Sequence, residues 1–233
     1  AYEISTRDWS SDVCSSDLEW LDKYRPLLEM WWSWDIRVWR NALPPGSPPH
    51  ENQPYAFKAF AMKSAIDMGY ETVTWIDSVV HMEGPALSYL ECLKSEGHYF
   101  QNNGFSCAQT CSDRMLSHYG ISRDEAQNIP EVVGGFWGLH RRNKDFIEEL
   151  IINSELGLFS GSRNHSLEDS KDPRFLFCRH DQSLMSLMAH KRGWIPKITE
   201  AETFFNYRSS KDCIRKVECF VLERDYVPKH MPK

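Results

Sequence analysis

The sequence predicts an α/β fold in which a mostly parallel central sheet is flanked by helices. Segments whose apolar residues recur at helical spacing alternate along the chain with short apolar segments, which is the order of βα units. The clearest strand, residues 71–76 (ETVTWI), shows little polar alternation, as is typical of a parallel strand that helices cover on both faces. With 233 residues, of which 41% are apolar, the chain can bury the core of one domain.

A segment near the start of the chain fits neither of its neighbours. Residues Asp8–Leu18 read DWSSDVCSSDL and resemble, letter for letter, the translation of a common sequencing-library adapter. Foreign segments are set aside before any reasoning about the fold. We therefore interpret residues 1–18 as an uncertain or artefactual N-terminus and residues 19–233 as a single domain. The alternative is a natural loop rich in serine and aspartate.

The next elements are predicted from spacing and from proline and glycine. Residues 18–32 have apolar side chains at helical spacing, and Trp34–Trp39 alternate enough for a short strand. Residues 41–54 are dense in proline, which helices and central strands exclude, so they predict a loop. Residues 55–69 predict a helix that ends at Gly69, a good C-terminal cap.

Asp77 stands where the strand of residues 71–76 leaves the sheet. In open α/β sheets the binding crevice lies at the carboxyl ends of the strands, so Asp77 is placed to meet a substrate or a metal ion. Further along, residues 85–97 predict a helix with Gly97 beyond its end, and Ser122–Glu125 (SRDE) form a capping-box pattern that opens another.

The second half of the chain continues the alternation. Residues 130–139 (PEVVGGFWGL) predict a strand whose glycine pair, Gly134 and Gly135, allows close approach to the backbone. Residues 143–156 predict an amphipathic helix, and the polar residues 160–174 predict a loop.

Residues 175–193 (FLFCRHDQSLMSLMAHKRG) predict a short strand that becomes a helix, with His180, Asp181 and Gln182 at the junction. The N-terminus of a helix stabilises negative charge through its free N–H groups and its dipole, so we expect Asp181 to be ionised. The simpler alternative is that Asp181 only caps the helix.

Charge and composition restrict the partners. The net charge is −6 at pH 7 and the basic residues are scattered, so we expect no nucleic-acid partner. No apolar run approaches the roughly 20 residues that cross a bilayer, and no basic segment followed by a hydrophobic one opens the sequence. These features predict a cytoplasmic protein without a transmembrane segment.

The seven cysteines are odd in number and irregularly spaced, which favours reduced thiols. Cys107 and Cys111 (CAQTC), with Cys92, His98 and His118 nearby in sequence, could hold zinc, although their loose spacing favours buried thiols.

Four segments in order carry a resemblance: residues 54–80 (PYAFKAFAMKSAIDMGYETVTWIDSVV), 97–105 (GHYFQNNGF), 131–139 (EVVGGFWGL) and 172–189 (DPRFLFCRHDQSLMSLMA). Over roughly Trp34 to Tyr207 the chain resembles small GT-A-fold glycosyltransferases of bacteria and large DNA viruses, in the nucleotide-diphospho-sugar transferase superfamily. The resemblance implies a Rossmann-like GT-A sheet and transfer of a sugar from a nucleotide-sugar donor to a hydroxyl acceptor, such as a glycan.

The resemblance also implies roles for particular residues. It places the superfamily's DxD motif, which holds a divalent cation such as Mn²⁺ or Mg²⁺ on the donor, at Asp77, Ser78 and Val79. Because Val79 replaces the second acid, His180 or Asp181 would have to supply the missing ligand, or the metal is bound weakly or not at all. Lys58 would then compensate by reaching a phosphate, unless it is simply a solvated helix lysine.

The start of the last helix is similar to the Asp-Gln helix start of glycogenin-like transferases, which implies that Asp181 and Gln182 lie beside the transferred sugar as the catalytic pair. Asn103 is a candidate for binding sugar hydroxyls, although a turn explains Asn103 and Gly104 equally well. The glycine pair is a further candidate for donor binding. If Asp181 is not the catalytic carboxylate, Glu131 is the next candidate.

Two other functions stay open at this point. A haloacid-type phosphotransferase also has an acid at a strand end, but it needs a second acid where Val79 stands. A non-catalytic, zinc-stabilised binding module would use Cys107 and Cys111.

Overall fold

The computed structural model describes residues 43–50, 52–77, 80–82, 86–159, 170–198, 204–207 and 220–222. The adapter-like segment, the helix expected at 18–32 and the strand expected at Trp34–Trp39 lie outside the described residues. So do Ser78, Val79 and most of the loop expected at 160–174.

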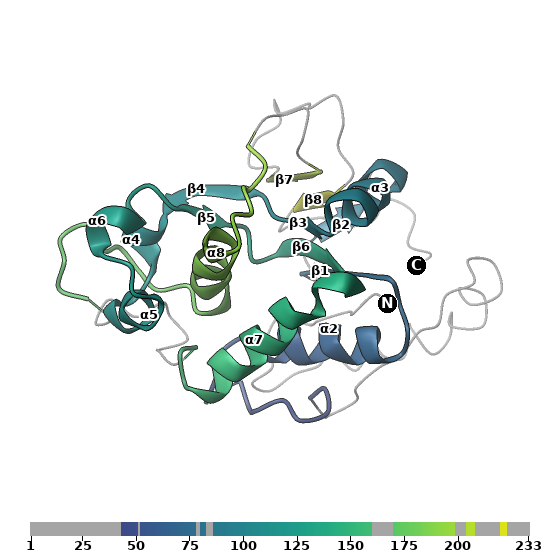
Figure 1. The fold of residues 1–233 in the computed structure, drawn as a ribbon, viewed down its shortest axis with the longest axis horizontal. Helices are drawn as coiled ribbons and strands as arrows, with labels where there is room; N and C mark the ends of the chain where they lie inside the picture. Colours follow the sequence, from purple (N-terminus) through teal and green to yellow (C-terminus); the bar gives the residue numbers. More distant parts are fainter. Residues whose placement is uncertain are drawn as a thin grey trace, which may run out of the picture.

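The described residues form a mixture of helices and strands (Figure 1). In chain order the elements are α2 (Phe57–Asp67), β1 (Thr72–Ile76), β2 (Val80–Met82), α3 (Leu87–Glu96), β3 (His98–Tyr99), β4 (Asn102–Ser106), α4 (Cys107–Thr110), α5 (Asp113–Tyr119), α6 (Arg123–Ala126), β5 (Pro130–Val132), β6 (Phe136–His140), the 3₁₀ helix η1 (Arg141–Asn143), α7 (Lys144–Glu155), α8 (Asp181–Lys191), β7 (Phe205–Tyr207) and β8 (Phe220–Leu222). Among them, no helix is both long and apolar enough to cross a membrane.

A three-stranded sheet in the order β1-β6-β3 lies at the centre, and both of its pairings are antiparallel. In the register of β1 on β6, Thr72 lies opposite His140 and Ile76 opposite Phe136. The prediction that the strand at 71–76 belongs to a parallel sheet is therefore wrong for its pairing with β6. Burial in fact alternates along β1, with Val73 and Trp75 buried and Thr72, Thr74 and Ile76 only half-buried. This alternation is typical of an antiparallel strand with one buried face.

Helices cover this sheet on both faces, as the sequence predicted. On one face Val73 and Trp75 join a core shared with α2, α7 and α8, and α2 and α7 lie side by side below the sheet in Figure 1. On the other face α3 packs against β3 and β6 through a second cluster that includes Tyr89, Leu93 and Phe136. The central sheet therefore has Val73 and Trp75 buried on one face and is covered by α3 on the other.

Two smaller sheets complete the described part, one in the order β2-β8-β7 and one that pairs β4 with β5. Three local expectations change here. Residues 130–139 form two strands, β5 and β6, with the glycine pair between them, and residues 175–179 form no strand. Asn103 and Gly104 lie within β4, where the register on β5 shifts and Gly104 has a φ of 89°, so they do not form a simple turn.

The end signals of the helices are confirmed. Gly97 follows α3 in the left-handed conformation with a φ of 87°, and its N–H donates to the carbonyl of Leu93. Ser122 and Glu125 form both hydrogen bonds of a capping box at the start of α6. These signals depend on atoms a few residues apart, which is why the sequence alone predicts them well.

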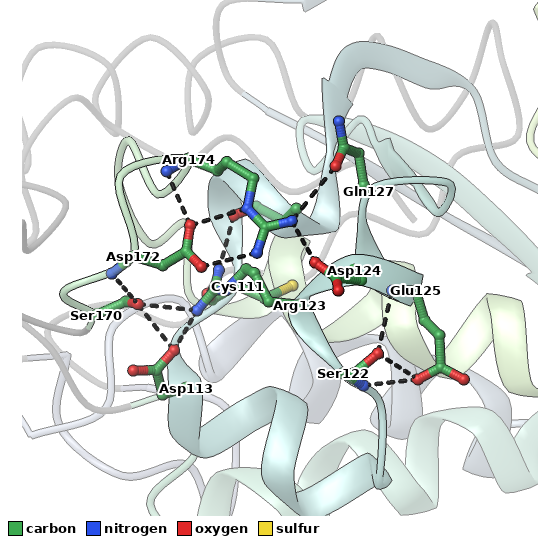
Figure 2. Close-up of polar contacts among 11 residues, drawn as sticks. Cys111, Asp113, Ser122, Arg123, Asp124, Glu125, Gln127, Ser170, Asp172 and Arg174 are labelled. Carbon is green, nitrogen blue, oxygen red and sulfur yellow. Dashed lines mark hydrogen bonds and ion pairs between the residues drawn. The ribbon is translucent and has the colours of Figure 1, made fainter.

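Arg123 is the centre of a polar network that joins α4, α5 and the segment leading to α8 (Figure 2). Its Nη1 donates to the carbonyl oxygens of Ala108 at 2.7 Å and Cys111 at 2.8 Å. Its Nη2 donates to the carboxylate of Asp113 and, at 3.1 Å, to the hydroxyl of Ser170. The guanidinium therefore satisfies carbonyl groups at the end of α4 that have few other donors within reach.

Arg174 extends the network along the same segment (Figure 2). Its Nη2 lies 2.8 Å from Asp172 Oδ2, and its Nη1 lies 2.7 Å from Asp124 Oδ1 on α6. Residues 170–174 are in this way held against α6, close to where the chain turns into α8.

Replacing Arg123 by methionine should lower the free energy of unfolding by about 2 kcal/mol, because the carbonyls of Ala108 and Cys111 lose their donor in a poorly hydrated place. Arg141→Met is the matched control, since the side chain of Arg141 is 52% exposed and lies 3.9 Å from its acidic partner. Urea unfolding measures both. Equal losses in the two variants would show that the Arg123 network contributes nothing special.

Candidate functional site

The ammonium group of Lys58 joins three segments that are far apart in the sequence. Its Nζ lies 3.4 Å from Asp77 Oδ1 at the end of β1 and 3.4 Å from Asp181 Oδ2 at the start of α8. It also donates a hydrogen bond of 3.1 Å to the carbonyl of Gly134. The side chain of Lys58 is only 6% exposed, so it is not a solvated helix lysine. We call Lys58, Asp77 and Asp181 the charge triad.

Asp77 is fixed by the strand it follows and by the neighbouring strand. Its N–H donates to the carbonyl of Gly135 at 2.9 Å, and the indole Nε1 of Trp75 donates to Asp77 Oδ1 at 2.6 Å. A Cβ atom on Gly135 would lie 2.8 Å from Asp77 Oδ2. A side chain at position 135 would therefore displace the Asp77 carboxylate from its present position.

Asp181 and Gln182 are the first two residues of α8, and both are buried. The prediction that Asp181 only caps this helix is wrong, since the capping position is occupied by His180 and Asp181 Oδ2 faces Lys58. Gln182 Oε1 accepts a hydrogen bond of 2.9 Å from the N–H of Gly134. A Cβ atom on Gly134 would lie 2.8 Å from that oxygen. The absence of a side chain at Gly134 thus leaves room for Gln182, as the absence of one at Gly135 leaves room for Asp77.

The backbone around Lys58 is strained. Among the described residues, the non-glycine residues with positive φ are Tyr55, at 65°, and His180, at 53°. Their rings lie 5.8 Å apart, and Lys58 Nζ lies 5.0 Å from the centre of the Tyr55 ring. Because such conformations cost about 1–3 kcal/mol each, they persist where packing enforces them, and they concentrate at functional sites.

The charges of the triad depend on one another. Burial lowers the pKa of Lys58, but the carboxylates of Asp181 and Asp77 outweigh burial, so that this pKa is raised and the amine is charged at neutral pH. Burial raises the pKa of Asp181 to about 6, against the attraction of Lys58. Asp181 is thus ionised at pH 7 but gains a proton much more readily than an exposed aspartate does.

Glu131 and Asn103 lie next to these residues, on β5 and β4. Glu131 is fully buried, and its Oε2 accepts a hydrogen bond of 2.8 Å from Asn103 Nδ2. Burial raises the pKa of Glu131, and Asn103 and the nearby charge of Arg179 oppose this rise. Asn103 is thereby oriented by a buried acid.

Arg179 is a residue that sequence reasoning missed. Its guanidinium carbon lies 4.9 Å from the ring centre of Phe177 and 5.5 Å from that of Phe105. Its positive charge acts on the buried carboxylate of Glu131. The only signal in the sequence is its position directly before His180 and Asp181, which by itself does not distinguish it from a surface arginine.

The residues in place do not fit a divalent cation. A hard cation requires several oxygen ligands, at about 2.0–2.6 Å for Mg²⁺ or Ca²⁺, and the carboxylate oxygens of the triad instead face the ammonium of Lys58. His180 was expected to help Asp77 hold the metal, but it is buried and its Nδ1 lies 3.2 Å from the carbonyl of Phe159. Within the described ranges, no group of three or more His, Cys, Asp or Glu side chains is arranged for a metal.

Cys107 and Cys111 are buried free thiols on and just after α4. Burial and the neighbouring Cys107 thiol raise the pKa of Cys111 well above its ordinary value, which disfavours the thiolate that zinc requires. These features favour the buried-thiol interpretation of the CAQTC segment.

An open groove of about 730 Å³ borders β4, and its lining includes Gly104, Phe105, Gln109 and Arg174. A second hollow of about 570 Å³ lies between α2 and α7. Neither is lined by a member of the charge triad.

A scan against models of known protein families gives no match to this chain, and a search of curated proteins gives none either. The function is therefore argued from the geometry of the site.

Lys58→Met should lower the free energy of unfolding at pH 7 by about 3 kcal/mol, because two carboxylates lose their shared counter-ion. This is the low end of the usual range, since the side chain of Asp77 is 36% exposed and Asp181 can take up a proton. Lys63→Met, on the same helix and with its side chain 41% exposed, should cost far less. Chemical denaturation of both variants checks this, and similar losses would contradict a special role for Lys58.

Proposed function

We propose that this protein is a glycosyltransferase that moves a sugar from a nucleotide-diphosphate donor to an acceptor hydroxyl, such as one on a glycan. The resemblance would make it a GT-A-type domain, and the antiparallel pairing of β1, β6 and β3 departs from the mostly parallel sheet of that fold. The observation that carries the proposal is the charge triad, since Lys58, Asp77 and Asp181 are three of the residues to which the family resemblance assigns donor binding and catalysis.

Stability alone gives little reason to retain such a triad. Burying charged groups costs several kcal/mol per ion, and a well-packed apolar replacement is often neutral or stabilising. Here the buried charges also coincide with strained backbone at Tyr55 and His180. Buried titratable groups with shifted pKa values and local strain together are typical of sites kept for function.

The chemistry requires a base and a stabilised leaving group. As the acceptor oxygen bonds to the anomeric carbon, the bond from that carbon to the diphosphate breaks with its electron pair, and the acceptor proton must go to a base. Asp181 is our candidate for this base, because a carboxylate with a pKa of about 6 is well matched to work near neutral pH. Lys58 supplies fixed positive charge beside Asp181, and Arg179 supplies it near Glu131.

Other residues of the site would hold the donor. Gln182, which follows Asp181 and whose side chain lies beside Glu131, is the candidate for contact with the transferred sugar. Asp77 is the most exposed member of the triad and is held in place by Trp75, which suits contact with the donor. Asn103, oriented by Glu131, is the further candidate for the sugar.

A thermal-shift screen of nucleotide sugars tests donor binding. We expect one donor to raise the melting temperature, because a ligand that binds only the native state stabilises it by mass action. The Asp77→Asn protein should stay folded but should need at least about ten times more donor to reach the same shift in melting temperature. A shift that is the same in Asp77→Asn would contradict the donor-binding role of Asp77. A panel without any stabilising donor would count against the proposed function.

Asp181→Asn tests the base. The change keeps the volume and removes the ionisable group, so turnover should fall by about 100-fold or more while donor affinity changes little. The fold should survive because Lys58 keeps its contacts with Asp77 and Gly134. Asp145→Asn, in the first turn of α7 and 65% exposed, is the control. If the Asp181→Asn protein keeps near-full sugar transfer, Asp181 is not the catalytic base, and Glu131 becomes the next candidate.

A further inference from the structure

The surroundings of Lys58 Nζ are those of a bound cation. Three oxygen atoms face it: Gly134 O at 3.1 Å, Asp77 Oδ1 at 3.4 Å and Asp181 Oδ2 at 3.4 Å. The ammonium donates a hydrogen bond to Gly134 O and lies at ion-pair distance from both carboxylate oxygens. A divalent metal bridging the two carboxylates would have to lie between the same oxygens.

The ammonium is also held from its other side. Lys58 Nζ lies 5.0 Å from the ring centre of Tyr55 and 5.3 Å from that of Trp75, within the range of cation–π attraction. The helix that carries it is anchored by Phe57 and Ala59, which are buried in the core. Moving the ammonium out would therefore break contacts with two rings, two carboxylates and a carbonyl.

A metal ion and this ammonium exclude each other. A metal bound to Asp77 Oδ1 and Asp181 Oδ2 together would lie next to Lys58 Nζ, and two positive charges in contact in a poorly hydrated place repel strongly. Val79, where the resemblance expects a second acid, is consistent with a site that has no need of another metal ligand.

We propose that Lys58 is the built-in cation of this site, in the position that a divalent metal would take between Asp77 and Asp181. The carboxylate pair then binds Mn²⁺ or Mg²⁺ only when Lys58 is removed, and sugar transfer needs no divalent metal. The statement about metal binding stands on the geometry of the triad, whereas the statement about turnover rests on the proposed function.

Metal binding is measured directly, without a donor. Mn²⁺ is titrated into the intact protein, and bound Mn²⁺ is followed by electron paramagnetic resonance and by the melting temperature. We expect the unmodified protein and Lys63→Ala to bind no Mn²⁺ at the triad. Lys58→Ala should bind one Mn²⁺ per chain and gain stability from it, and Lys58→Ala combined with Asp181→Asn should lose that binding.

Two results would overturn the proposal. In the first, the unmodified protein binds Mn²⁺ and Asp77→Asn abolishes that binding. This result can be interpreted without any Lys58 variant. The other is a folded Lys58→Ala protein that binds no Mn²⁺, because the carboxylate pair would then not be a latent metal site. If Lys58→Ala does not fold without metal, refolding in the presence of Mn²⁺ supports the proposal, and failure to refold with Mn²⁺ counts against it.

Turnover gives the second arm of the test. With a donor found by thermal shift, sugar transfer in a chelator should equal transfer in Mn²⁺ within about twofold. Transfer that stops in the chelator and returns with Mn²⁺ would overturn the metal-independent mechanism. Absence of transfer under every condition would instead count against the proposed function, and the Mn²⁺ titration would still decide the role of Lys58.

Discussion

The contact of one buried ammonium with two carboxylates is the constraint on which the rest of this site depends. Lys58, Asp77 and Asp181 come from α2, the end of β1 and the start of α8, and each is stabilised only while the others are in place. Removing the lysine leaves two carboxylates facing each other, and removing both acids leaves a buried ammonium. The triad therefore requires that three distant segments meet accurately, with 3.4 Å between Lys58 Nζ and each carboxylate.

The antiparallel sheet and the glycine pair provide that accuracy. Because Ile76 lies opposite Phe136, the residue that follows β1 lies beside the residue that precedes β6, which is Gly135. On the other side α8 packs against β5, and Gln182 reaches the N–H of Gly134. The Arg123 network holds the segment that enters α8. The direction of the strands, which sequence reasoning got wrong at this pair, is thus part of what builds the site.

The sequence by itself determined the features that depend on near neighbours. The left-handed cap at Gly97 and the capping box of Ser122 and Glu125 appear as predicted, because their hydrogen bonds span only a few residues. Asp77 also lies at a strand end, as predicted, since the strand before it is short and strongly apolar.

Only the tertiary structure decided which distant groups meet. The sequence presented Lys58 equally well as a solvated lysine, and Asp181 equally well as a helix cap, because neither pattern shows the partner that lies across the fold. The glycine pair separates two strands of different sheets, although its flanking residues look like one continuous strand. Arg179 gave no signal beyond its place in the chain. Strand pairing, burial of charge and local strain arise from contacts between segments tens of residues apart, and local pattern carries no information about such contacts.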